Sequence, residues 1–181
     1  MFGKILIASF FCLIIVCHTT FGQTHTTRAA PNKANEISVK FPNLKKQADE
    51  MAKAITTNDF DKFADFMYPK VIEMVGGREK FITGLKAAME QVKSSGIESS
   101  DYVVENPTQK INFEKHIFSI LPTETTIKTR NETINMVGGL IGISQDNGKN
   151  WTFIRIQSKE VLKRLFPKVA DKLKIPVIGI K

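Results

Sequence analysis

Cysteine is missing from most of this sequence. Both cysteines, Cys12 and Cys17, fall within the first 22 residues. Beyond that point the chain has no thiolate nucleophile, no cysteine metal site and no disulfide. A domain of this size must then be held together by its hydrophobic core alone.

Histidine is nearly as scarce, and dense runs of one charge are lacking. Of three histidines, only His116 lies beyond residue 25. One histidine without clustered carboxylates offers too few ligands for a metal ion. No Gly-x-Ser-x-Gly motif, Ser-His-Asp set or glycine-rich phosphate loop occurs. No basic run is interleaved with aromatic residues, as a nucleic-acid groove requires. The sequence therefore predicts no metal, no cofactor and no nucleic-acid partner.

Residues 1–22 have the pattern of a signal peptide. Lys4 gives a positive start, Ile5–Val16 is an uncharged apolar run, and Thr20 and Gly22 are the small residues before a cleavage site. The run is too short to span a bilayer, which takes about 20 helical residues. We expect an exported protein, periplasmic or secreted, without a transmembrane anchor after cleavage. The alternative is lipid attachment at Cys17.

The remaining chain divides into a linker over residues 23–40 and one domain over residues 41–181. Cleavage removes one lysine and no acidic residue, which leaves 25 basic and 18 acidic residues. The linker is polar and has no hydrophobic periodicity. Apart from a basic group at 159–174, the charges are scattered, which is typical of a solvated surface.

Hydrophobic periodicity predicts helices first and strands afterwards. Apolar residues recur at helical spacing over 43–56, 60–67 and 78–95, with Asn43 as the expected cap of the first helix. Residues 70–75 are expected to form a short strand. Strands are expected over 101–106, 116–129, 132–144 and 150–157, and the amphipathic stretch 159–174 predicts a C-terminal helix. The fold class is α+β: N-terminal helices packed on an antiparallel sheet, which Gly138-Gly139 and Gly142 bend strongly.

The segment SQDNGKNW, residues 144–151, matches the Asp-box pattern of sialidase propellers. It occurs once, and the chain is too short for a propeller, which repeats its unit. Asn147-Gly148 supplies the positive φ angles of a tight hairpin, and Asp146 can accept backbone N–H bonds inside the turn. We interpret the segment as a structural brace between two strands, with Trp151 folded over its base.

The stretches TTNDFDKFADFMYPKVIEMVGGREKF and DNGKNWTFIRI carry a resemblance to a known superfamily. They resemble the opening helices and the closing hairpin of the nuclear transport factor 2-like, or SnoaL-like, cone fold, in particular its small secreted bacterial members. The resemblance covers roughly residues 41–157. It implies a cystatin-like roll, a sheet-lined cavity whose mouth often carries Asp, His, Tyr or Arg, and frequent homodimers.

Three residues are candidates for the cavity. Tyr68 ends the second helix, His116 shares an apolar strand face with Phe118, and Arg155 alternates with Trp151 and Phe153 on the last strand. A phenol or guanidinium in an apolar pocket binds an oxyanion, and His116 is a candidate general base. Each residue also has a structural interpretation, as a core or solvated side chain. Asp61 and Asp65 are four residues apart on one predicted helix, and we interpret them as part of its solvated face.

Three functions remain open from the sequence. The leading hypothesis, based on the lack of a convergent catalytic set, is an exported non-catalytic domain that binds a small apolar or anionic ligand, or a partner. The second is a SnoaL-like isomerase, dehydratase or hydrolase using His116 or an Asp with Tyr68, which rests on fold analogy. The third is an envelope-surface interaction protein that uses the basic C-terminal stretch.

Overall fold

The computed structural model describes residues 40–156, 159–176 and 178–180. The predicted signal peptide, the candidate lipidation site Cys17 and all but the last residue of the predicted linker lie outside the described residues. Within the part that is described, no helix combines the length and apolar character needed to cross a membrane.

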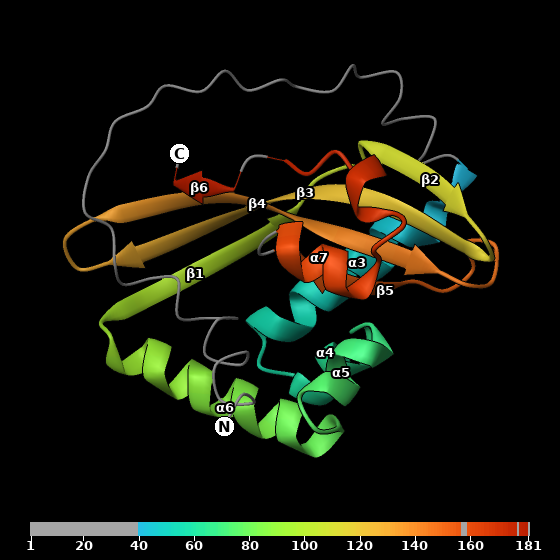
Figure 1. Cartoon of the computed structure of the whole chain (residues 1–181). Coiled ribbons are helices and arrows are strands. Elements are labelled where there is room, and N and C mark those ends of the chain that lie inside the picture. Colours follow the sequence, from blue (N-terminus) through green and yellow to red (C-terminus); the bar gives the residue numbers. More distant parts are fainter. Residues whose placement is uncertain (1–39, 157–158, 177, 181) are drawn as a thin grey trace.

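Helices precede the strands along the chain, in an α+β arrangement (Figure 1). The helices are α3 (Pro42–Thr56), α4 (Phe60–Asp65), α5 (Pro69–Met74) and α6 (Arg78–Ser94). The strands β1 (Ile97–Val104), β2 (Gln109–Phe113), β3 (His116–Thr129), β4 (Thr133–Ser144) and β5 (Thr152–Arg155) follow. A short helix α7 (Lys159–Leu165), a 3-10 turn η1 (Ala170–Lys172) and the two-residue strand β6 (Gly179–Ile180) complete the described elements.

All of these strands pair antiparallel in one strongly curled sheet that forms a half-barrel. The long hairpin of β3 and β4 is its centre, with Leu121 opposite Leu140 and Thr123 opposite Gly138. Strands β1 and β2 share the outer edge of β3, while β5 and β6 share the outer edge of β4. The helices pack against the sheet, which is compatible with a cone-like fold (Figure 1).

The two faces of the sheet carry separate hydrophobic clusters. The face that we call the α3 face bears Leu121, Leu140 and Phe153, which pack with α3, α4 and α6. The opposite face, which we call the α7 face, bears apolar side chains that pack with α7 and the segment after it. They are Phe118, Ile120, Ile141, Ile143, Ile154 and Ile156. Side chains alternate between faces along a strand, so neighbours such as Leu140 and Ile141 belong to different clusters.

Several elements differ from the sequence-based expectation. Residues 70–75 were expected as a strand, but Pro69 at the first helical position starts α5 instead. Helix α3 begins at Pro42 without a side-chain cap, and Asn43 donates its amide to the carbonyl of Lys149, 3.1 Å away. Strand β2 was not expected. The stretch 159–174 is not one helix, because α7 ends at Leu165 and η1 follows.

Candidate functional site

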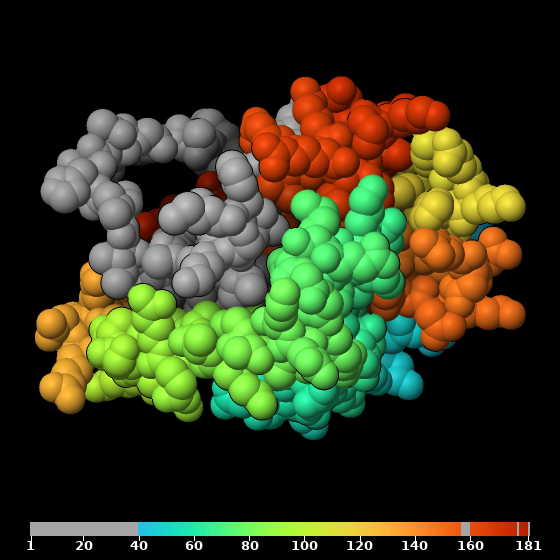
Figure 2. Space-filling view, turned by 60° about the horizontal axis from the view of Figure 1, so that its bottom comes forward, coloured from blue at the N-terminus to red at the C-terminus, as the bar shows by residue number. Residues whose placement is uncertain are grey.

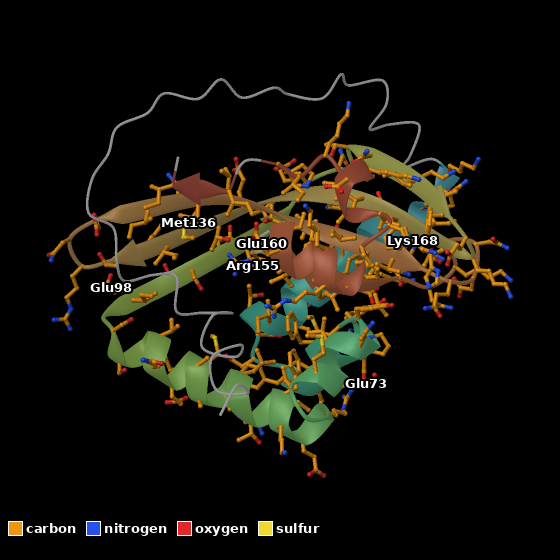
Figure 3. All side chains as sticks on the ribbon, viewed as in Figure 1. Glu73, Glu98, Met136, Arg155, Glu160 and Lys168 are labelled. Carbon is orange, nitrogen blue, oxygen red and sulfur yellow. The ribbon has the colours of Figure 1, made fainter. Side chains whose placement is uncertain are left out.

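Arg155 lies at the end of β5, on the α3 face of the sheet. It is paired with Leu140 of β4, and its neighbours Ile154 and Ile156 belong to the α7-face cluster, so its own side chain projects the other way. Figure 3 labels Arg155 and Met136 along the same stretch of the sheet. The Arg155 side chain is half-buried, and Figure 3 labels it beside Glu160 of α7.

Tyr102 and Thr123 lie next to Arg155 on this face. Tyr102 belongs to β1, packs against the α3-face cluster, and hydrogen-bonds the Thr123 side chain. Burial raises the pKa of the Tyr102 phenol, and the nearby Arg155 charge and the Thr123 hydrogen bond oppose that rise. Tyr102 is therefore a neutral hydrogen-bonding group at neutral pH.

Gly138 brings these residues within reach of one another. It lies opposite Thr123 on β4, and a Cβ atom at this position would lie 3.2 Å from Thr123 Oγ1. Because Gly138 has no side chain, β4 places no bulk between Arg155 on β5 and Tyr102 on β1. A guanidinium from one edge of the sheet and a phenol from the other thus approach each other across it.

The surroundings of this polar group are apolar. Leu121 and Leu140 are fully buried beside it, and Met136 and Ile127 continue the same face toward the tip of the β3–β4 hairpin. We call Tyr102, Thr123, Arg155 and Met136 the α3-face site. It offers several hydrogen-bond donors with one positive charge beside hydrocarbon, which suits an anionic head group with an apolar body.

Tyr68 and His116, the other two sequence candidates, lie on the α7 face. The Tyr68 ring packs on Phe166, with centroids 5.3 Å apart, and Phe166 packs edge-on against Phe118 at 5.1 Å. The His116 ring lies 5.9 Å from Phe118 at the other end of this row, and its Nε2 is 3.1 Å from Gln145 Nε2. Burial, and then the negative charge of Glu73, raise the pKa of Tyr68.

The structure therefore separates the three candidates. Phenylalanine rings fill the space between Tyr68 and His116, and Arg155 lies on the other side of the sheet. No proton can pass directly between His116 and a substrate held at Arg155. Asp61 and Asp65 are also engaged elsewhere, because both accept from the Arg78 guanidinium at the start of α6, at 3.4 and 2.7 Å.

The Asp-box hairpin forms the brace that the sequence predicts. Asp146 Oδ1 accepts from the Ser144 hydroxyl at 2.8 Å and from the Asn150 backbone N–H at 2.9 Å. The Gly148 N–H donates to Ser144 Oγ at 2.9 Å, and Trp151 Nε1 donates to the Gly148 carbonyl at 3.0 Å. These contacts use the polar atoms of the motif to fix its own turn.

The same hairpin is tied to α3. Gln47 donates its amide to the Lys149 carbonyl at 3.0 Å and accepts from the Trp151 backbone N–H at 2.7 Å. The Phe41 ring packs edge-on against Trp151, with centroids 5.7 Å apart. The hairpin thus anchors the first helix to the sheet.

Comparison with known proteins yields no relative: no family model, curated protein or solved structure matches this chain. Over the described residues, no group of three or more His, Cys, Asp or Glu side chains is arranged to hold a metal ion. The α3-face site is therefore interpreted from its own chemistry.

Sequence reasoning found one member of this site and missed the others. Arg155 stands out because it is a charge in an apolar strand. Tyr102 and Thr123 carry no comparable signal, since Thr123 lies among four threonines of one strand and Tyr102 in a polar strand. Their pairing depends on the register of β1 against β3, which places Val104 opposite Thr123 and Tyr102 opposite Thr125.

Proposed function

We propose that this protein is an exported, non-catalytic member of the cone-fold class that binds a small amphiphilic anion at the α3-face site. The observation that carries the proposal is Arg155: a half-buried guanidinium beside a neutral phenol and an apolar sheet face. A cation in such surroundings gains from an anionic partner. The apolar neighbours favour a hydrocarbon body on that partner.

Three further features support this proposal. The curled sheet with helices packed against it is compatible with the nuclear transport factor 2-like architecture that the sequence resembles. The predicted signal peptide supports export, to the periplasm or beyond the cell. The separation of Tyr68 and His116 from Arg155 argues against a shared catalytic set, and therefore against an isomerase or hydrolase that uses all three.

Binding of decanoate, with decanol as the uncharged control, tests the proposal. Native mass spectrometry of the protein after signal cleavage first shows whether a small anion is retained, and whether the protein is a monomer or the homodimer that the resemblance implies. Isothermal titration calorimetry then compares the unmodified protein with Arg155→Met and Tyr102→Phe. Charge-assisted hydrogen bonds are worth about 1.5–3 kcal/mol, so Arg155→Met is expected to weaken decanoate binding roughly tenfold to a hundredfold.

Lys128→Met serves as the matched control, since it removes one exposed positive charge from β3 on the other face of the sheet. It is expected to bind decanoate normally, as are Tyr68→Phe and His116→Ala. Equal binding by Arg155→Met and the unmodified protein, or equal affinity for decanol and decanoate, would refute the proposed site.

A further inference from the structure

The α3 face of the sheet continues beyond the cluster that packs under α3, α4 and α6. That cluster includes Leu121 and Leu140 of the central hairpin, but in the part of the chain that the structure describes it includes neither Met136 nor Ile134, farther along β4. Figure 2 shows the tip of the β3–β4 hairpin, in light orange at the left edge of the molecule, away from the bluish-green helices α4 and α5. Met136 and Ile134 are only partly buried, so their hydrocarbon is available to a ligand.

Apolar side chains line this end of the face on three neighbouring strands. Met136 pairs with Ile180 of β6 and Ile134 pairs with Ile127 of β3, and residues paired across strands project to the same face. Met136 and Ile134 are two residues apart on β4, so they also share that face. Ile180 is 63% exposed. We call these four side chains the distal α3 face.

Gly138 leaves a hollow between the distal α3 face and Arg155. A Cβ atom at Gly138 would lie 3.2 Å from Thr123 Oγ1, and apart from its neighbours in the chain no other described atom lies within 4 Å of that position. On β4, Gly138 lies between Leu140, which pairs with Arg155, and Met136. An anionic head group held by Arg155 would therefore lie over Gly138, and the distal α3 face begins directly beside it.

The distance from Gly138 to Ile134 is close to the length of a long acyl chain. Four residues of an antiparallel strand cover about 14 Å. An acyl chain of a membrane lipid covers half of a hydrocarbon core, or about 15 Å. A chain of that length with its carboxylate over Gly138 reaches Ile134, whereas the shorter chain of decanoate ends before it.

From these observations we infer that the amphiphilic anion is a long, unbranched fatty acid, with its carboxylate at Arg155 and its hydrocarbon chain along the distal α3 face. This inference rests on the proposed function, because it uses the same cation, and it adds the length of the chain and the surface that binds it. A phosphorylated sugar or a nucleotide also provides an anion, but its polar groups would lose water against isoleucine without gaining a hydrogen bond.

Isothermal titration calorimetry with fatty acids of two lengths tests the inference. Decanoate and tetradecanoate are titrated into the protein after signal cleavage, each below the concentration at which it forms micelles. Each methylene that leaves water contributes about fourfold in affinity, so tetradecanoate is expected to bind at least about tenfold more tightly than decanoate. Ile134→Asn is expected to remove most of this gain and to leave the affinity for decanoate unchanged.

Val137→Asn is the matched control. Val137 is also a partly buried residue of β4, but it pairs with Glu124 and projects to the α7 face. This variant is expected to keep the full gain. Circular dichroism establishes that both variants are folded, and Ile134→Ala, a milder change, takes the place of Ile134→Asn if the latter does not fold.

The failure of this inference is distinguishable from the failure of the proposed function. Decanoate binding that depends on Arg155, without tighter binding of tetradecanoate, would overturn the inference and leave the α3-face site in place. So would a gain that Ile134→Asn retains, or one that Val137→Asn loses equally. If neither fatty acid binds, or if binding does not depend on Arg155, both proposals are refuted.

Discussion

Asp146 shows how one carboxylate can stabilise a turn. Hydrogen bonds from Asn150, first from its backbone N–H, hold the pKa of Asp146 below its ordinary value of 3.8, against the opposing effect of partial burial. A lowered pKa in the folded state means that the carboxylate form stabilises the fold. That contribution is complete above the ordinary pKa and is lost as the pH falls below it.

Asp146→Ala is therefore expected to reduce the free energy of unfolding by about 2 kcal/mol at pH 7. The deficit relative to the unmodified protein should shrink between pH 4 and pH 2, because protonation removes the same contribution from the unmodified protein. Urea denaturation at several pH values between 2 and 7 measures this deficit. Asp101→Ala, which removes an exposed carboxylate from β1, is the control and should cost less than about 0.5 kcal/mol. A deficit that does not vary with pH would contradict the role assigned to the charge.

At the scale of elements, the contact between α3 and the Asp-box hairpin depends on a glycine. Gly148 has a φ of 88°, and a Cβ atom there would lie 2.3 Å from Cδ1 of Phe41, the residue that precedes α3. Gly96, which follows α6, has a similar φ of 82° but has no atom within 4 Å of the same position. An alanine at position 96 would therefore introduce backbone strain alone, whereas an alanine at position 148 would introduce backbone strain and steric overlap together.

Gly148→Ala is expected to lower the free energy of unfolding by about 3 kcal/mol or more, since the strained φ and the collision with Phe41 add together. Gly96→Ala should cost only about 1 kcal/mol, from φ alone. Urea denaturation of both variants provides the comparison. Equal costs would mean that Phe41 moves aside freely and that the hairpin does not fix the start of α3.

The elements that the sequence predicts well are those with an uninterrupted period. Helices α3 and α6 have apolar residues at helical spacing, and β3 and β4 are long and rich in β-branched residues. Strand β2 was missed because its five residues are too few to establish alternation. Helix α5 was mistaken for a strand because its six residues include apolar Val71, Ile72 and Met74 but are too few to show a distinguishing period.

The candidate site was less predictable than the fold for a related reason. Arg155 is visible as a charge in an apolar strand, but its partners come from β1 and β3, more than 30 positions earlier in the sequence. Which residues meet there depends on strand register, and a shift of one residue would send Tyr102 to the other face. Periodicity also placed Tyr68 and His116 on apolar surfaces, but it could not distinguish the two faces of the sheet.

At the scale of the whole molecule, the sheet is covered on both sides by different parts of the chain. The N-terminal helices cover the α3 face, and α7 with the segment after it covers the α7 face. Six apolar side chains of the C-terminal segment are buried there: Leu162, Leu165, Phe166, Val169, Ala170 and Leu173. The C-terminal segment is thus part of the hydrophobic core, although six of its residues over 159–174 are basic.

Leu162 and Ile180 provide a test of the contribution that the C-terminal segment makes to the core. Leu162 is 1% exposed, whereas Ile180 is 63% exposed. Leu162→Ala should lower the free energy of unfolding by about 3 kcal/mol, since it leaves a cavity against the sheet, and Ile180→Ala should cost less than about 0.5 kcal/mol. For the same reason, ending the chain after Gln157 should expose the α7 face and abolish cooperative unfolding. A truncated chain that unfolds cooperatively in urea, with unchanged stability, would show that the sheet and the N-terminal helices form a complete core without the C-terminal segment.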